Sequence, residues 1–141
     1  MDLTIPDLTG AQGLLYLEIS ASPAHTIMLC YSVVDRASFN ALKTTLMPKI
    51  KESIHKNAPL LLVGTKLDLV PQNLDEYVSP EEAERFAKEI NAVGSIQCSS
   101  FAQAKNKTGN VDTEFKLAMK AALEHEHPEL FRSSCCCGFS I

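Results

Sequence analysis

The chain has 141 residues, of which 45% are hydrophobic and 21% are charged, a composition typical of a globular protein large enough for one domain. Its formal net charge of -4 argues against nucleic acid as the main partner, because neutralising phosphates requires a concentrated basic surface. No apolar stretch is long enough to cross a bilayer, and the N-terminus lacks the residue order of a secretory signal. We therefore expect a cytoplasmic protein.

Three apolar runs predict buried β-strands. They occupy residues 26–33, residues 59–63 and, more weakly, residues 93–98, and each has the length of a strand. Helical patterns lie between and after them. Strands that alternate with helices indicate an α/β fold, in which a mostly parallel, doubly wound sheet is covered on both faces to give three layers.

The predicted helices are defined by their apolar spacing and their caps. In the first, between the strands predicted at 26–33 and 59–63, Ser38 is placed to cap the start and Pro48 to kink the middle. The second begins at the Ser79-Pro80 pair and runs to about residue 90, and the third spans about residues 110–124. Residues 70–78 and 102–109 are predicted loops. The side chains predicted to be buried are Phe39, Leu42, Leu46, Ile50, Ile54, Ala83, Phe86, Ala87, Ile90, Val111, Phe115, Ala118, Met119 and Ala122.

The most informative segment is Gly64-Thr65-Lys66-Leu67-Asp68, which directly follows the apolar run 59–63. If that run is a parallel strand, Lys66 and Asp68 emerge at its carboxyl end, where open α/β sheets bind ligands. A carboxylate fixed there can accept two hydrogen bonds from the ring and exocyclic N–H groups of guanine, whereas adenine presents no such pair of donors. The alternative is a strand end with a solvated Lys66 and with Asp68 capping the next turn.

Three segments in the same order resemble a known family. They are Met-Leu-Cys-Tyr-Ser-Val-Val-Asp-Arg-Ala-Ser-Phe over residues 28–39, Leu-Leu-Val-Gly-Thr-Lys-Leu-Asp-Leu over 61–69, and the blocks 87–93 and 97–100. Together they resemble the Rho branch of the Ras superfamily of small GTPases. The resemblance implies the small-GTPase fold over residues 1–131, followed by a cysteine-rich tail over 132–141.

The resemblance also implies a function. A Rho-like small GTPase is a signalling switch that binds the guanine nucleotides GTP and GDP with Mg²⁺, and its partners are Rho-type regulators and effectors. In the first guanine motif Asp68 would read the base and Lys66 would pack over it. In the second, a backbone N–H would approach the guanine carbonyl oxygen. The residues that match these two motifs are Thr65, Lys66 and Asp68, and Cys98, Ser99 and Ser100.

A third motif lies upstream. Asp7 and Gly10 match the Asp-x-x-Gly pattern that opens switch II, where the Asp would hold Mg²⁺ through water and the Gly N–H would sense the γ-phosphate. The family places a Gln after that Gly to orient the attacking water, but this chain has Ala11, with Gln12 one position later. We therefore assign no catalytic residue and expect poor hydrolysis.

The largest departure from the family is the phosphate-binding loop. No Gly-x-x-x-x-Gly-Lys-Ser/Thr pattern occurs in the chain, and Met1 falls where the family's third strand begins. We expect a fold truncated at the N-terminus that lacks this loop, switch I and the central first strand, with weak phosphate binding as the result. Residues 69–79 are also too few for the extra helix that Rho proteins usually insert.

Two alternatives to a working switch stay open. One is a non-catalytic pseudo-GTPase module that binds Rho regulators or effectors, and the other is an incomplete copy of a full-length Rho GTPase. Bound nucleotide after purification would favour the switch, whereas an empty protein that captures regulators would favour the module.

The tail contains adjacent cysteines. Cys135, Cys136 and Cys137 resemble the lipidated ends of small GTPases, but the prenylation signal requires Cys fourth from the end, where this chain has Gly138. The three thiols are candidates for palmitoylation and for attachment to the cytoplasmic face of a membrane; the alternative is a disordered, reactive tail. No metal is expected to bind directly to the protein.

Overall fold

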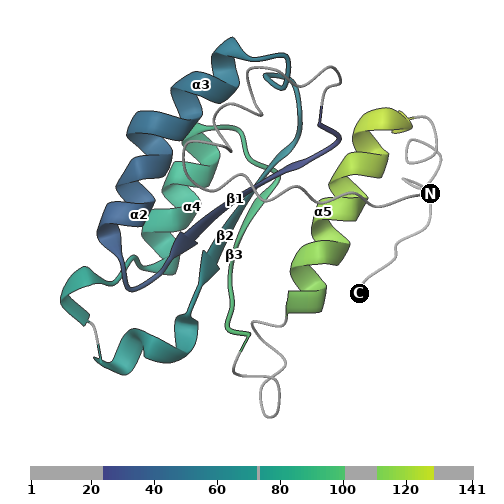
Figure 1. Cartoon of the computed structure of the whole chain (residues 1–141). Helices are drawn as coiled ribbons and strands as arrows, with labels where there is room; N and C mark the ends of the chain where they lie inside the picture. The colour runs from purple at the N-terminus through teal and green to yellow at the C-terminus, as the bar shows by residue number, and fades with distance from the viewer. Residues whose placement is uncertain (1–23, 73, 101–110, 129–141) are drawn as a thin grey trace.

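The computed structural model describes residues 24–72, 74–100 and 111–128. Within these ranges one parallel sheet has the strand order β1-β2-β3, formed by β1 (Ile27–Ser32), β2 (Leu60–Thr65) and β3 (Gly94–Gln97). Figure 1 shows α2, α3 and α4 on one side of the sheet and α5 on the other. The predicted strands, the parallel sheet and its three layers are therefore confirmed. The expected absence of a central first strand falls on the N-terminal residues, outside the described ranges.

Alternating side chains on β2 supply both faces of the sheet with core residues. Leu60 and Leu62 belong to the larger hydrophobic cluster, which includes the apolar residues of α2, α3 and α4. Leu61 and Val63 point the other way and pack in a second cluster with Ala118 of α5. Burial on both faces explains why this strand is apolar at every position rather than at alternate ones.

The first helical region is divided by a π-helical turn. It consists of α2 (Arg36–Ala41), η1 (Leu42–Leu46) and α3 (Met47–Glu52). In the π turn the Met47 N–H bonds to the Leu42 carbonyl, five residues back. Pro48 follows immediately. Since proline has no N–H and its ring crowds the carbonyl of the preceding turn, the widened turn is the form taken by the kink predicted at Pro48.

Two predictions for this region are wrong. The N-cap is Asp35, whose carboxylate accepts from the N–H groups of Ala37 and Ser38; the Ser38 hydroxyl instead accepts from the Ser32 N–H and donates to the Asp35 carbonyl. Ile54, predicted to be buried, is 49% exposed, because α3 ends at Glu52 and Ile54 lies beyond the helix.

Helix α4 (Pro80–Glu89) has the predicted N-terminal cap, in which the Ser79 hydroxyl accepts from the Glu82 N–H. It ends where Asn91 adopts the left-handed conformation with φ 55°. The N–H groups of Asn91 and Ala92 then bond to the carbonyls of Lys88 and Ala87, which is a Schellman motif. This turn reverses the chain into β3.

Helix α5 (Val111–Glu126) covers the second face of the sheet (Figure 1). Ala118, Ala121 and Ala122 are buried, whereas Met119, predicted to be buried, is 47% exposed. The predictions for Val111 and Phe115 lie outside the side chains that the structure describes. Helix α5 is joined to the chain before β1, since the Thr26 hydroxyl donates to the Ala118 carbonyl at 3.1 Å.

The connection from β2 to α4 contains two short 3₁₀ helices, η2 (Leu67–Gln72) and η3 (Leu74–Glu76), where the sequence predicted a loop. The described residues here form no α-helix, as expected for a connection too short to hold the inserted helix of Rho proteins. The chain then runs without helix or strand from Tyr77 to Ser79 into α4. The second predicted loop, over residues 102–109, lies outside the described ranges.

Candidate nucleotide-binding site

The loops that follow β2 and β3 are bonded to each other at the carboxyl edge of the sheet. Lys66, the first residue after β2, has φ 62°, a left-handed conformation that is uncommon for a residue with a side chain. The turn it makes lets the Leu67 N–H bond to the Cys98 carbonyl at 3.0 Å, while the Cys98 N–H bonds to the Gly64 carbonyl at 2.7 Å. Backbone hydrogen bonds thus hold the two predicted guanine motifs side by side.

The side chains of the two motifs also meet. The Ser99 hydroxyl donates to the Asp68 carboxylate, and Ser99 is buried whereas Asp68 is exposed. A buried hydroxyl therefore orients an accessible carboxylate. Each carboxylate oxygen can accept more than one hydrogen bond, so this contact leaves acceptor capacity for the N–H groups of a ligand.

The remaining motif residues differ in their surroundings. Lys66 and Ser100 are exposed, so both residues are accessible to a ligand. Thr65 is directed inward instead, because its hydroxyl donates to the Tyr31 carbonyl at 3.0 Å. The structure thus places Thr65 as a link between β1 and β2, and Lys66 and Asp68 as the accessible members of the first motif.

A polar network beneath these loops was not predicted from the sequence. The Gln97 amide donates to the Tyr31 hydroxyl at 3.2 Å and to the Val78 carbonyl at 2.9 Å. Burial raises the pKa of Tyr31, so its hydroxyl stays protonated at neutral pH. The sequence signal that could have found Gln97 is a polar residue on a strand directly before a loop motif.

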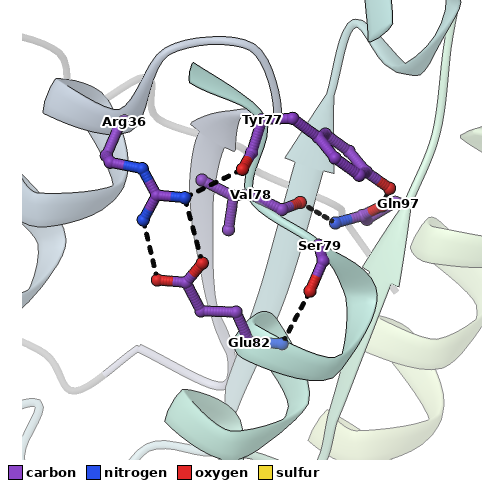
Figure 2. A network of polar contacts seen from close by, with 6 residues as sticks. All are labelled: Arg36, Tyr77, Val78, Ser79, Glu82 and Gln97. Atoms are coloured by element: carbon purple, nitrogen blue, oxygen red, sulfur yellow. Dashed lines mark hydrogen bonds and ion pairs between the residues drawn. The ribbon is translucent and has the colours of Figure 1, made fainter. Parts of the chain in front are cut away.

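A second polar contact joins α2 to α4. Arg36 forms a two-pronged ion pair with Glu82, with N–O distances of 2.9 and 3.2 Å, and also donates to the Tyr77 carbonyl at 2.8 Å. Figure 2 shows these bonds together with the Ser79 cap and the bond from Gln97 to Val78. The hydrogen bond from Arg36 lowers the pKa of Glu82. The pair fixes the segment that enters α4.

A groove of about 270 Å³ lies beside the first motif. Neither Asp68 nor Ser99 lines this groove, so the contact between their side chains lies outside it. Its lining residues are Leu67, Tyr77, Pro80, Glu84, Ser95 and Gln97.

Several predicted site residues lie outside the described ranges. They are Asp7 and Gly10 of the switch II motif and Cys135, Cys136 and Cys137 of the tail. Among the residues that the structure does describe, no helix is long and apolar enough to cross a membrane.

The comparisons with known proteins agree with these motifs. A sequence model of the Ras family matches residues 2–124. The chain is 31% identical over 135 residues to the Ras-like GTP-binding protein RhoL of Drosophila melanogaster, an alignment that covers 95% of this chain and 67% of that protein. It is 33% identical over 125 residues to the GTP-binding protein RHO4 of Saccharomyces cerevisiae, with 87% of this chain and 41% of that protein covered. The chain therefore belongs to the Ras family of small GTPases, in its Rho branch.

Proposed function

We propose that this chain is a guanine-specific binding module of the Rho type, in which Asp68 accepts hydrogen bonds from the base and Lys66 lies along it. The observation that carries the proposal is the contact between the Ser99 hydroxyl and the Asp68 carboxylate. It joins the two loops at the carboxyl ends of β2 and β3, where a base could rest against both. The exposed Ser100 would present its backbone N–H to the guanine carbonyl oxygen.

We expect the affinity of this chain for the phosphates of the nucleotide to be low. Among the 141 residues there is no Gly-x-x-x-x-Gly-Lys-Ser/Thr pattern, and in that pattern backbone N–H groups and the Lys hold the β- and γ-phosphates. A few base contacts, each with a net value of about 1 to 3 kcal/mol, do not offset the loss of translational and rotational freedom on binding. We expect affinity for GDP weaker than micromolar and slow hydrolysis, given Ala11 after the Asp7–Gly10 motif.

The test exchanges the hydrogen-bonding pattern of position 68. Guanine presents two donors to a carboxylate, whereas xanthine has a carbonyl in place of the exocyclic amine. Asp68→Asn offers one donor and one acceptor, so it should favour xanthosine diphosphate over GDP, while the unaltered chain should favour GDP. Binding is measured for both nucleotides by NMR titration, which detects millimolar affinities.

Asp75→Asn is the matched control, because Asp75 is an exposed carboxylate on η3 and should leave the preference for GDP unchanged. An unaltered chain that binds both nucleotides equally would overturn the base-reading role. Sub-micromolar binding of GDP in the presence of Mg²⁺ would instead overturn the claim of weak phosphate binding.

The alternative function is an interaction module that binds Rho regulators or effectors without hydrolysing GTP. The observation that favours it is Ala11 in the position of the water-orienting Gln. Purified protein that carries no guanine nucleotide and shows no preference for it, yet binds Rho exchange factors, would support the module instead of the switch.

We also propose that Cys135, Cys136 and Cys137 are acylated. Two acyl chains suffice for stable attachment to a membrane, whereas one gives only reversible binding. Acyl-exchange labelling of the protein from eukaryotic cells should show at least two modified thiols, and changing all three cysteines to serine should abolish the label. Labelling that persists in the triple variant would contradict the assignment.

A further inference from the structure

The side chain of Tyr31 lies directly under the first base-reading loop. Tyr31 is 2% exposed, and its ring packs against Phe39 with 4.9 Å between centroids. A Cβ at Gly64 would lie 2.8 Å from the Tyr31 hydroxyl oxygen, so the phenol fits only because residue 64 has no side chain. The backbone carbonyl of Tyr31 also accepts from the Thr65 hydroxyl. Tyr31 of β1 thus contacts the end of β2 in two ways, through its side chain at Gly64 and through its backbone carbonyl at Thr65.

Gln97 connects this phenol to the second loop. It is paired in register with Gly64, and its amide donates to the Tyr31 hydroxyl. The next residue is Cys98, whose N–H and carbonyl make the two backbone bonds between the loops. Because the side chain of Gln97 is fixed by Tyr31, the start of the Cys98–Ser100 turn is fixed relative to Gly64.

The third contact of Gln97 is with the segment that enters α4. Its amide donates to the Val78 carbonyl at 2.9 Å, as Figure 2 shows. Val78 is itself held by a bond from its N–H to the Val33 carbonyl at 2.8 Å, and the preceding carbonyl, of Tyr77, accepts from Arg36. The position of Gln97 therefore depends on β1 on one side and on this clamped segment on the other.

We propose that Tyr31 and Gln97 are positioning residues for guanine recognition, which hold Asp68 and the Cys98–Ser100 turn at the spacing that a base requires. The inference rests on the proposed base-reading role of Asp68. Neither side chain needs to touch the nucleotide, since both act through the backbone of the loops. The bond from Gln97 to the Val78 carbonyl also connects these residues to the segment before α4.

The test measures discrimination between GDP and inosine diphosphate, which lacks the exocyclic amine that Asp68 would bind. Tyr31→Phe removes only the hydroxyl, and Gln97→Met removes the amide while keeping a side chain of similar length. Each should lower the ratio of the two affinities by about 3- to 10-fold, the equivalent of one net hydrogen bond. Partial unfolding would weaken the binding of both nucleotides equally and leave the ratio of their affinities unchanged. A change in this ratio therefore reports on positioning and not on the stability of the fold.

The double variant should lower the ratio no further than the larger single effect, because Gln97→Met already breaks the bond that Tyr31→Phe removes, together with the bond to Val78. Tyr77→Phe is the control: it removes a phenol hydroxyl that also contacts Gln97, but at 3.5 Å, and the ratio should stay near that of the unaltered chain. Hydrogen exchange of the Leu67 and Cys98 amides without nucleotide should speed up in Tyr31→Phe and Gln97→Met only.

The outcomes distinguish this inference from the proposed function. If the unaltered chain prefers GDP and both variants keep its ratio and its exchange rates, the positioning role is overturned while the function of Asp68 stands. If the unaltered chain shows no preference for GDP, base reading itself fails, and the positioning role fails with it.

Discussion

Gly64 leaves no room for a side chain at the end of β2. A Cβ there would lie 2.7 Å from the Val33 side chain as well as against the Tyr31 phenol, and both neighbours are buried in a close-packed core. We expect Gly64→Ala to lower the free energy of unfolding by about 1 to 3 kcal/mol, measured by urea denaturation. Gly94→Ala is the control, because its nearest atom would be Leu61 Cδ1 at 3.7 Å. Equal losses in the two variants would contradict the close approach at Gly64.

His55 is a buried polar residue that fixes the chain before β1. Its Nδ1 accepts from the Ala24 N–H at 2.8 Å, so in the neutral ring the proton is on Nε2. Within the described part of the chain Nε2 has no hydrogen-bond partner. The ring thus contributes one satisfied acceptor and one unsatisfied donor to the interior.

Substitutions at His55 should show how much the bond to the Ala24 N–H contributes to stability. His55→Ala removes the buried ring and leaves the Ala24 N–H unpaired, and we expect a loss of about 2 to 4 kcal/mol in the free energy of unfolding. His55→Asn places an oxygen near the position of Nδ1 that can accept from the Ala24 N–H, so its loss should be smaller than that of His55→Ala by about 1 kcal/mol, the value of one net hydrogen bond. Chemical denaturation of both variants provides the measurement. An equal or larger loss in the Asn variant would show that the bond to the Ala24 N–H contributes little to stability.

Among the elements, α2 and α4 are joined by the Arg36–Glu82 pair, which should make stability depend on pH. The pKa of Glu82 is lowered in the fold, chiefly by the hydrogen bond from Arg36. A lowered folded pKa means that the unfolded chain binds the proton more readily, so the contribution is present above the ordinary value of 4.5 and is lost as pH falls through the folded pKa. Since both side chains are partly solvated, the effect should be small and weaker in high salt.

Glu82→Gln is the variant that tests this dependence. The unaltered chain should be more stable than the variant at pH 7, and the difference should shrink as pH falls below 4.5, as followed by urea midpoints in low salt. Glu84→Gln is the control, since Glu84 is exposed and forms no ion pair with any other described residue. A Glu82→Gln difference that is constant down to pH 3 would show that the pair adds no pH-dependent stability.

The elements also show what the sequence could and could not predict. The strands were predictable because apolar runs such as 59–63 are buried on both faces. The contact between Asp68 and Ser99 was predictable because each residue follows the carboxyl end of a strand in the same parallel sheet. The π turn before Pro48 was not predictable, because the apolar spacing fits an unbroken helix equally well. The bond between Tyr31 and Gln97 depends on the register of three strands and on the absence of a side chain at Gly64. These features belong to the tertiary structure, and no local sequence pattern indicates them.

On the scale of the whole molecule, the two faces of the sheet are covered in different ways. The α2–α4 face buries large side chains, including Phe39 and Phe86 in edge-to-face contact with centroids 5.4 Å apart. The α5 face is closed by alanines, which let the helix approach the sheet closely. Cys98 packs on that second face with Leu61, Val63 and Ala118. The backbone that joins the loops after β2 and β3 is therefore supported from both sides, by Gln97 and by α5.

Enlarging an alanine of α5 should consequently weaken both the fold and the site. Ala118→Leu adds volume where Leu61, Val63 and Cys98 already meet the helix, and we expect a loss of about 1 to 3 kcal/mol in the free energy of unfolding. Because Cys98 lies in the same cluster, exchange of its amide should accelerate more than that of the Val78 amide, which is bonded on the opposite face to Val33. Leu117→Ala, at a position that is 40% exposed, should cause less than about 1 kcal/mol of change and leave both amides as they were. If Ala118→Leu accelerates the two amides alike, then α5 stabilises the domain only globally, and local support of the Cys98–Ser100 turn comes from Gln97 and not from α5.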